Sequence, residues 1–310
     1  MISRKYILIL AGLIILFYTI AINNILNNDQ ISFIFKYKSN NILSQSSIIL
    51  PPLYIITPTF RRPEQLAELT RLGYTLKHIK NLLWLVIEDS NEPSKLVIKT
   101  LDRIKVPYIY LQSPMPDIYK KKKGAKPRGV ANRNRGLKWL RDNIKNNTEN
   151  SQMMGVFYFA DDDNTYDISL FEEIRYTKKV SFFPVGLVTK LGVSSPILKN
   201  GKFDGWYDGW IGKRKYAVDM AGFAVSVSFL FQRPTAKMPF TPGYEEDGFL
   251  KSLHPINSTD IEYLANKCTE ILCWHTQTKK NNNPTKLILN KYKETNLVEL
   301  TKMLINKTEN

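Results

Sequence analysis

Short, continuously apolar runs alternate with segments of helical periodicity through the first part of this 310-residue chain. Runs of this kind predict strands that are buried on both faces. Their alternation with helices predicts an α/β fold in which a parallel sheet carries helices on either side. The expected strands span residues 53–57, 82–89, 106–111 and 155–160, and the expected helices begin near Pro63, Val130 and Ser169.

Three of these expected strands lead into distinctive residues at their carboxyl ends. They are Pro58–Phe60 after the first strand, Glu88–Asp89 at the end of the second and Asp161–Asp163 after the fourth. Ligands of parallel α/β sheets bind beyond the carboxyl ends of the strands, so these residues are expected to meet at one edge. That arrangement is typical of a nucleotide site.

The acidic triplet Asp161–Asp163 places three like charges where they repel one another. The triplet is either a solvated turn or a site in which a cation offsets the repulsion. Mg²⁺ and Mn²⁺ prefer oxygen ligands and leave coordination positions for phosphate oxygens. Because the preceding strand is apolar and two other strands end in polar residues, we favour a divalent-cation site that uses two of the acids.

The second half of the chain has a different pattern. Ser169 opens a helix with Glu172 at the capping-box position, and beyond about residue 190 glycine, tryptophan and tyrosine become frequent. Within residues 223–229, apolar residues alternate with small ones, which predicts a half-buried strand. We expect a mixed sheet with long loops here. Aromatic and charged residues in such loops suit sugar binding.

The N-terminal segment predicts a membrane anchor. Arg4 and Lys5 precede an apolar run over residues 6–22, which as a helix is about 26 Å long and suits a thin bilayer. No small-residue cleavage site follows the run, so an anchor retained over residues 6–24 is favoured over a cleaved signal peptide. The positive flank keeps residues 1–5 in the cytosol.

Polar sequence surrounds the expected globular part. Residues 25–50 are rich in Asn, Ser and Gln and predict a stem, and residues 280–310 form a basic tail to which we assign no chemistry. The net charge is +16, from 44 Lys and Arg against 28 Asp and Glu, which favours anionic partners. We expect no nucleic acid partner, because neither zinc-finger spacing nor a base-reading basic helix is present.

Seven segments, taken together and in order, resemble the β-1,3-glucuronyltransferases. They run from about Pro52 to Lys279 and read PTFRRPEQLAELTRL, LLWLVIEDS, PRGVANRNRGLKWL, YFADDDNTYDISLFEEIR, FPVGLV, VDMAGFAV and CWHTQTK. DDDNTY and DMAGFA in one chain are the most specific of these. The resemblance implies a membrane-anchored enzyme of the GT-A fold that transfers glucuronate from UDP-glucuronate to a terminal galactose.

The resemblance also implies a domain plan and a location. The GT-A catalytic domain would span residues 51–279, with a Rossmann-like UDP-sugar-binding half over 51–163 and a mixed-sheet acceptor-binding half over 164–279. The protein would be a single-pass type II protein of the Golgi membrane with this domain in the lumen. Mn²⁺ is the expected cofactor, with Mg²⁺ as the second choice, and a homodimer is compatible with the family.

The donor site follows from the resemblance residue by residue. A guanidinium group suits both a diphosphate and a carboxylate, so the two arginines fit their family positions. The matching positions are Pro58, Phe60 and Asp89 around the uridine, Arg128 and Arg133 near the nucleotide and donor sugar, Asp161 and Asp162 as donor-side contacts, Asp163 as main metal ligand, and His275 near UDP-glucuronate.

On the acceptor side, Trp210, Arg214 and Asp219 match positions that hold galactosides in the family. The catalytic base of the family is a glutamate, for which GYEEDGFL offers Glu245 and Glu246. Two acids at a helix start can also be simple partners of the helix dipole. Counting back from the segment FLKSL selects Glu246 as the base that takes the proton from the galactose 3-hydroxyl.

Two residues depart from the family pattern. Ser194 stands where the family has an acceptor-binding glutamate, and Gln277 stands where it has an arginine. The acceptor therefore stays open between the Gal-Gal-Xyl linker of proteoglycans, which we favour, and N-acetyllactosamine-type glycans. A catalytically inactive, sugar-binding type II membrane protein is a third hypothesis, against which the retained triplet and Glu246 argue.

Overall fold

The structure is a computed structural model that describes residues 50–144 and 154–276, together with residues 278, 291, 295–298 and 300. The expected anchor, nearly all of the stem, most of the basic tail and Gln277 lie outside these residues. Among the helices that the structure describes, none is both long and apolar enough to cross a membrane.

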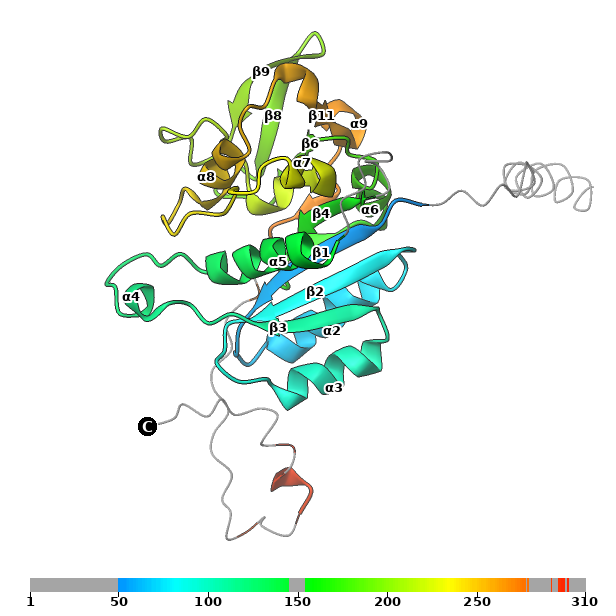
Figure 1. Cartoon of the computed structure of the whole chain (residues 1–310), viewed down its shortest axis with the longest axis vertical. Coiled ribbons are helices and arrows are strands. Elements are labelled where there is room, and N and C mark those ends of the chain that lie inside the picture. Colours follow the sequence, from blue (N-terminus) through cyan, green and yellow to red (C-terminus); the bar gives the residue numbers. More distant parts are fainter. Residues whose placement is uncertain are drawn as a thin grey trace, which may run out of the picture. The chain divides into compact units, whose positions relative to one another are not determined.

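A seven-stranded sheet contains all four strands expected from the sequence (Figure 1), in the order β11-β6-β10-β4-β1-β2-β3. Four neighbouring strands run parallel: β1 (Leu53–Thr59), β2 (Leu82–Glu88), β3 (Tyr108–Gln112) and β4 (Val156–Phe159). Thr59 lies opposite Glu88, and Glu88 lies opposite Gln112. The carboxyl ends of these strands therefore meet at one edge, as predicted.

The remaining three strands make the sheet mixed. β10 (Phe223–Ser226) runs antiparallel between β4 and β6 (Val180–Phe182), and β11 (Ile261–Tyr263) runs parallel to β6. The expected half-buried strand over residues 223–229 is wrong in two respects. All four residues of β10 are buried, and the strand ends at Ser226, whose Oγ accepts the Phe229 N–H at 3.2 Å and starts α7 (Val227–Phe231).

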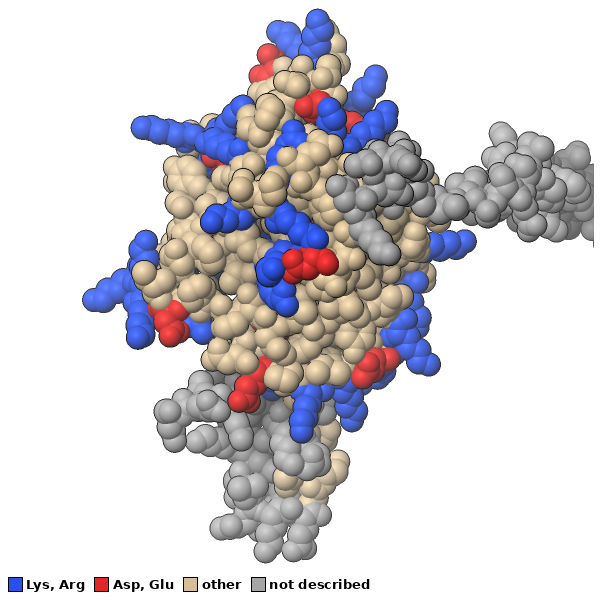
Figure 2. Space-filling view, in the orientation of Figure 1, with Lys and Arg blue, Asp and Glu red and all other residues tan. Residues whose placement is uncertain are grey.

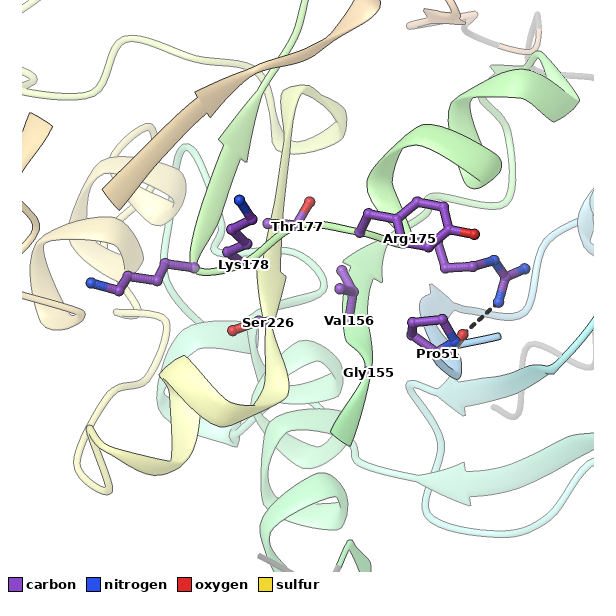
Figure 3. Close-up of a pocket in the computed structure, with 9 residues that line it drawn as sticks. Pro51, Gly155, Val156, Arg175, Thr177, Lys178 and Ser226 are labelled. Atoms are coloured by element: carbon purple, nitrogen blue, oxygen red, sulfur yellow. Dashed lines mark hydrogen bonds between the residues drawn. The ribbon is translucent and has the colours of Figure 1, made fainter. Parts of the chain in front are cut away.

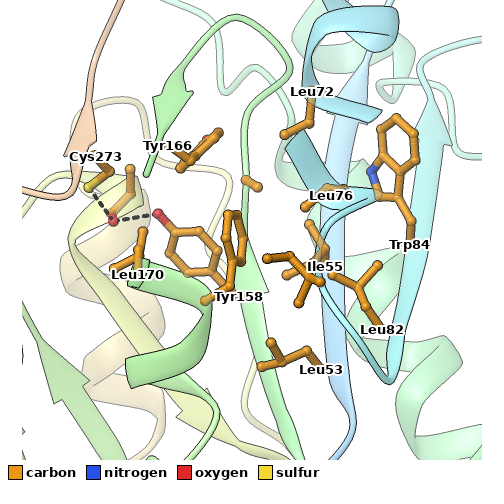
Figure 4. Packing of buried hydrophobic residues seen from close by; sticks show 14 of the residues in the cluster. Leu53, Ile55, Leu72, Leu76, Leu82, Trp84, Tyr158, Tyr166, Leu170 and Cys273 are labelled. Atoms are coloured by element: carbon orange, nitrogen blue, oxygen red, sulfur yellow. Dashed lines mark hydrogen bonds between the residues drawn. The ribbon is translucent and has the colours of Figure 1, made fainter. Parts of the chain in front are cut away.

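Helices cover both faces of the parallel strands, which gives the sheet two hydrophobic cores. One core lies under α2 (Gln65–Leu76) and α3 (Lys95–Ile104), and Figure 4 shows part of it. The other lies under α5 (Val130–Asn143), α7 and α8 (Glu245–Ser252). Neighbouring residues of β1 accordingly serve different cores: Leu53 and Ile55 pack in the first, and Ile56 packs in the second.

Two helix starts differ from the expectation. Asp167 is the N-cap of α6 (Ile168–Ile174) and accepts the Ser169 N–H at 2.9 Å and the Ser169 hydroxyl at 2.5 Å. The expected capping box of Ser169 and Glu172 is therefore wrong. The second difference is α3, which the sequence analysis did not predict and whose N-cap is Ser94.

A second sheet has the order β5-β12-β7-β8-β9 and confirms the expected change to a mixed pattern. β12, which lies next to the edge strand β5, pairs antiparallel with β5 and parallel with β7, so the chain just after residue 274 returns beside the acidic triplet. The strands are β5 (Thr165–Tyr166), β7 (Val185–Gly186), β8 (Val193–Lys199), β9 (Lys202–Tyr207) and β12 (Cys273–Trp274); the short helices are α4 (Asp117–Lys120), α9 (Leu264–Cys268) and the 3₁₀ turns Met220–Gly222 and Ser258–Asp260.

Candidate active site

Asp162, the middle acid of the triplet, is buried. It accepts hydrogen bonds from Thr59, the last residue of β1, and from Arg62, which follows this strand. Its carboxylate accepts two hydrogen bonds from the Arg62 guanidinium, at 2.7 and 3.0 Å, and one from the Thr59 hydroxyl at 2.8 Å. Burial raises the pKa of Asp162, and Arg62 and Thr59 act against that rise. Asp162 therefore ties the triplet to the end of β1. The sequence analysis missed Arg62, although a buried carboxylate requires such a partner.

Asp161 pairs with Arg133 of α5, one of the two arginines that the resemblance places near the donor. Arg133 is buried and forms an ion pair with Asp161, and its Nη1 donates to the Arg128 carbonyl at 3.4 Å. The Arg128 side chain itself is exposed. The structure thus places the Arg133 side chain between Asp161 and the backbone carbonyl of Arg128.

Gly129, the N-cap of α5, allows this arrangement. It has a φ of +73°, a left-handed conformation that side chains disfavour. A Cβ atom there would lie 2.5 Å from Nη1 of Arg133. A side chain at this position would therefore displace the guanidinium from Asp161.

Asp163 differs from its two neighbours because it forms no ion pair within the described part of the chain. Burial, followed by the charges of Asp161 and Asp162, raises its pKa to about 6, and Arg62 opposes the rise. The expectation that two acids of the triplet bind the metal disagrees with these contacts, since arginines occupy the other two. Among the described residues, no cluster of three His, Cys, Asp or Glu side chains could hold a metal ion. The donor set fits a cation that is bound by one carboxylate together with ligand phosphates.

A buried polar network supports the edge where the uridine is expected. Gln65 donates to Glu88 at 2.9 Å and to Thr59 at 3.2 Å, and the Tyr110 hydroxyl donates to the other oxygen of Glu88. Asp89 donates its backbone N–H to the Thr59 carbonyl at 2.8 Å. The sequence analysis did not predict this network, because its members come from four separate elements, β1, α2, β2 and β3.

The predicted uridine residues lie at this edge with different exposure. Phe60 is 45% exposed, and the Arg62 guanidinium carbon lies 4.8 Å from the centroid of its ring. Asp89 accepts the Met115 N–H at 2.8 Å and so fixes the chain that follows β3. Pro58, in β1, lies against Gly129. The Phe60 ring is thus available for stacking on a planar ligand.

His275 connects the second sheet to the triplet. Its backbone N–H donates to the Gly186 carbonyl at 2.8 Å, and its Nδ1 lies 3.4 Å from Oδ2 of Asp219. The neighbouring Thr276 hydroxyl donates to the Asp163 carbonyl at 2.7 Å. His275, which we predicted to lie near the donor, is therefore in direct contact with Asp219, which we predicted to bind the acceptor.

Glu246, in the first turn of α8, has the electrostatics of a general base. Burial raises the pKa of Glu246 to about 7, the charges of Asp219 and Glu245 add to the rise, and Arg133 opposes it. A base with a pKa near the working pH is well matched to proton transfer. Because Asp219 and Arg133 both act on Glu246, the predicted base lies in the same neighbourhood as residues predicted for the acceptor and the donor.

Asp247 has a structural role next to the base. Its carboxylate accepts the N–H groups of Lys215 and Tyr216, at 2.8 and 3.0 Å, and pairs with Lys251 at 2.6 Å. These contacts hold the loop after β9 against α8. They also provide partners for the charge of Asp247.

The other residues predicted to bind the acceptor differ in how far they are exposed to solvent. Trp210 is 54% exposed, whereas Arg214 is buried and pairs with the buried Asp208 at 2.9 Å. Ser194 is fully buried in β8 opposite Val185, and its hydroxyl has no hydrogen-bond partner among the described residues. Trp210 is therefore the open member of this group, and Ser194 does not face solvent.

A separate pocket of about 250 Å³ lies at the opposite edge of the sheet, before β1 and β4 (Figure 3). Two of its three charged side chains are paired with other groups of the protein, and the third, Lys178, is exposed. The Arg175 guanidinium donates to the Pro51 and Lys80 carbonyls at 2.6 Å each, and Lys179 pairs with Asp260 at 2.5 Å. The polar groups that converge without full pairing are at the carboxyl edge, and we assign the candidate site there.

Comparison with known proteins finds a matching family model and several curated relatives. Residues 72–279 match glycosyltransferase family 43. The chain is similar to galactosylgalactosylxylosylprotein 3-beta-glucuronosyltransferase P of Drosophila melanogaster, with 66% identity over 255 residues, which cover 82% of this chain and 52% of the relative. It is 44% identical over 236 residues to galactosylgalactosylxylosylprotein 3-beta-glucuronosyltransferase 2 of Homo sapiens, which covers 75% of this chain and 71% of the relative.

Among solved structures, S. aureus TarS 1-349 in complex with UDP-GlcNAc superposes with a TM-score of 0.46 and 13% identity. The superposition covers 74% of this chain and 60% of that one. The chain spans about half the length of the Drosophila relative.

Proposed function

The chain belongs to glycosyltransferase family 43, and from this premise we propose that it is an inverting glucuronosyltransferase. It would move glucuronate from UDP-glucuronate to the 3-hydroxyl of a terminal galactose. The observation that carries the proposal is the position of Glu246. Burial raises the pKa of this half-buried carboxyl to about 7, and the charges of both Asp219 and Arg133 act on it.

The donor would bind along the carboxyl edge of the seven-stranded sheet. The Phe60 ring and Asp89 would hold the uridine, and Arg128 and Arg133 would face the diphosphate and the glucuronate carboxylate. Guanidinium groups bind both of these anions in a two-pronged geometry. Asp161 and Asp162 would act mainly by fixing Arg133 and Arg62, and His275 would complete the donor side.

Asp163 is the residue that would hold a divalent cation, Mn²⁺ or Mg²⁺, together with the donor phosphates. When bound, the cation supplies positive charge that stabilises the departing UDP. The raised pKa of Asp163 agrees with such a role, because burial and the charges of Asp161 and Asp162 disfavour its ionised form, which a bound cation would favour.

The transfer step would use Glu246 as the base. Its carboxylate accepts the proton of the galactose 3-hydroxyl while that oxygen forms a bond to the anomeric carbon of glucuronate. The bond from the anomeric carbon to the diphosphate breaks, and UDP leaves with the electron pair on the opposite face. A positioned base of this kind accelerates the reaction by a factor of about 10²–10⁴.

For the acceptor, we propose the Gal-Gal-Xyl linker, because the names of the curated relatives describe that acceptor. Trp210 would stack on a sugar face. Asp219 would accept a hydrogen bond from a galactose hydroxyl. Ser194 is buried, so the contact that the family makes through a glutamate there is missing. N-acetyllactosamine-type glycans therefore remain the second candidate.

We also propose that residues 6–24 anchor the protein in the Golgi membrane, with the catalytic domain in the lumen. The support is the apolar run after Arg4 and Lys5. N-terminal sequencing of the protein purified from cells is expected to start before residue 6. A start beyond residue 22 would show that the segment is removed.

A donor and acceptor screen tests the function directly. The purified protein with Mn²⁺ is incubated with UDP-glucuronate, UDP-glucose or UDP-N-acetylglucosamine, and with Gal-Gal-Xyl or N-acetyllactosamine glycosides. We expect transfer from UDP-glucuronate and faster transfer to Gal-Gal-Xyl. Faster transfer to N-acetyllactosamine would select the second acceptor class. Binding of UDP without transfer to any acceptor would favour the catalytically inactive, sugar-binding protein.

A further inference from the structure

A basic loop joins β3 to α5 and is defined here as residues 113–129. Its six cationic residues lie within the nine positions 120–128, and all of them are exposed. They are Lys120, Lys121, Lys122, Lys123, Lys126 and Arg128. None of them forms an ion pair within the described ranges. Figure 2 shows blue side chains projecting from the part of the surface where Figure 1 places α4, which begins this run. The cations therefore project a positive field into solvent.

The basic loop is fixed to the candidate site at three points. The Met115 N–H donates to Asp89 at 2.8 Å, and the Arg128 carbonyl accepts from Arg133 at 3.4 Å. Between these points, the Tyr119 ring stacks on Phe240, with centroids 4.6 Å apart and planes at 4°. Phe240 lies in the segment that leads into α8, the helix of Glu246. The loop thus extends from the donor side to the helix that carries the base.

Two further loops on the acceptor side add exposed lysines of the same sign. Lys213 and Lys215 lie in the loop after β9, which is bonded to α8 through Asp247. Lys237 is also exposed, and its N–H donates to Ser252 at the end of α8, at 3.2 Å. Two acids nearby are neutralised, since Asp247 pairs with Lys251 and Asp208 pairs with Arg214, whereas Glu245 and Glu246 form no ion pair among the described residues. Exposed lysines therefore lie on three loops around α8.

The chemistry of this surface points to an extended ligand. Lysine ammonium groups are strongly hydrated, mobile point charges, and they lack the rigid fork with which arginine binds a single phosphate. The basic loop also offers no buried polar group that could hold one discrete anion. Such a surface suits a flexible chain of carboxylates, whose association it accelerates through long-range attraction.

We infer that the basic loop binds an acidic polypeptide segment of the acceptor glycoprotein, close to the glycan that is modified. This inference rests on the proposed function, and it adds a second determinant of acceptor choice beyond the terminal sugar. The loop would favour glycans attached to acidic stretches of protein over the same glycans on neutral ones.

The test uses two variants of the full chain with the same change in charge. In the first, Lys120, Lys121, Lys122 and Lys123 are each changed to Gln. In the control, the exposed lysines Lys77, Lys80, Lys95 and Lys99, which lie on or next to α2 and α3, are each changed to Gln. Fluorescence anisotropy measures binding of a labelled glutamate-rich peptide that carries no sugar. Initial rates then give KM for a galactoside linked to that peptide and for the free galactoside.

We expect the first variant to bind the acidic peptide about tenfold more weakly and to raise KM for the peptide-linked galactoside by a similar factor. KM for the free galactoside, KM for UDP-glucuronate and kcat should change less than about twofold. The difference from the original protein should disappear near 1 M salt, where the screening length is about 3 Å. The control variant should behave like the original protein.

Three results would overturn the inference. Equal losses in the two variants would show that only total charge matters. A raised KM for UDP-glucuronate with unchanged peptide binding would assign the loop to the donor. Tighter binding of a sulfated or phosphorylated galactoside than of the acidic peptide would assign it to an anionic sugar. Peptide binding is measured without turnover, so failure of the proposed glucuronyl transfer would be seen separately.

Discussion

Four carboxyl groups of the candidate site differ in what surrounds them, and these surroundings separate their roles. Asp162 is held by Arg62 and Thr59, and Asp161 is paired with Arg133. Asp163 and Glu246 have raised pKa values, of about 6 and about 7. Carboxyl groups with different partners are suited to different tasks in one reaction. Asp161 and Asp162 hold arginines in position. Asp163 suits the binding of a cation, and Glu246 suits proton transfer.

At this scale, Glu246→Gln should lower kcat by a factor of about 10²–10⁴. The amide keeps the size and polarity of the side chain but accepts no proton. Calorimetric binding of UDP should stay nearly unchanged, because the loss concerns only the transition state. Glu245→Gln is the matched control and should change kcat little. If the two variants exchanged these effects, Glu245 would be the base.

The raised pKa of Glu246 also predicts how activity and stability depend on pH. The base must be ionised, so kcat/KM should fall as pH decreases through about 7. The folded protein holds the proton more tightly than the unfolded chain, whose usual pKa is 4.5. The stability contributed by Glu246 is therefore lost as pH rises between these values. Glu246→Gln should raise the melting temperature more at pH 8 than at pH 4.5, and an equal shift at both would contradict the assignment.

Arg62 should matter for stability because it is the ion-pair partner of the buried Asp162. Arg62→Ala leaves Asp162 buried without its cation, which costs about 3–5 kcal/mol in the free energy of unfolding. Urea denaturation measures this loss. Arg61→Ala is the control, since Arg61 forms no ion pair among the described residues. Adding Asp162→Asn to Arg62→Ala should recover part of the stability, and no recovery would show that the cost arises elsewhere.

At the scale of elements, the site depends on where helices and strands start and end. The acidic triplet leaves the end of β4, Arg133 lies in the first turns of α5, and Glu246 lies in the first turn of α8. The left-handed Gly129 before α5 permits the Arg133 side chain to reach Asp161. The residues at which these helices and strands begin and end therefore determine where the charged groups of the site lie.

Gly129→Ala tests this dependence. It combines left-handed strain of about 1–2 kcal/mol with a contact of 2.5 Å against Arg133. Gly124→Ala is the matched control, because Gly124 has a φ of +86° but nothing within 4 Å of its Cβ position. We expect both variants to lose stability, and only Gly129→Ala to raise the KM for UDP-glucuronate several-fold. A similar donor KM in the two variants would contradict the role of Gly129.

At the scale of the whole molecule, the two sheets are joined at the site. β12 pairs with β5 just beyond the triplet, and Thr276 donates to the Asp163 carbonyl. Ligand bound at Asp163 should therefore stabilise both sheets together rather than one of them.

UDP with Mn²⁺ should accordingly raise the melting temperature of a single unfolding transition. The stabilisation is about 2.7 kcal/mol at a ligand concentration of 100 times Kd. Excess chelator, or Asp163→Ala in the presence of Mn²⁺, should remove most of this shift and abolish turnover. Differential scanning fluorimetry measures the shift, and full turnover in chelator would contradict the role proposed for Asp163.

The amino-acid sequence by itself determined the strands β1 to β4, the helices α2 and α5, and the edge at which Asp89 and the triplet meet. These follow from local patterns, since apolar runs and helical spacing report burial within one element. The resemblance to a family added Arg133, His275 and Glu246. Ser226 as the end of β10, and Asp167 as the start of α6, were not predicted, because neighbouring residues compete for the same cap.

Only the tertiary structure decided how the charged groups are paired. The Arg62–Asp162 and Arg133–Asp161 pairs join residues 100 and 28 positions apart. It also showed that Ser194 is buried and that the basic loop is held between Asp89 and Phe240. The pKa of Glu246 depends mainly on its burial, which α8 acquires only by packing on the sheet. Such contacts depend on distance in space, and a sequence pattern records distance only along the chain.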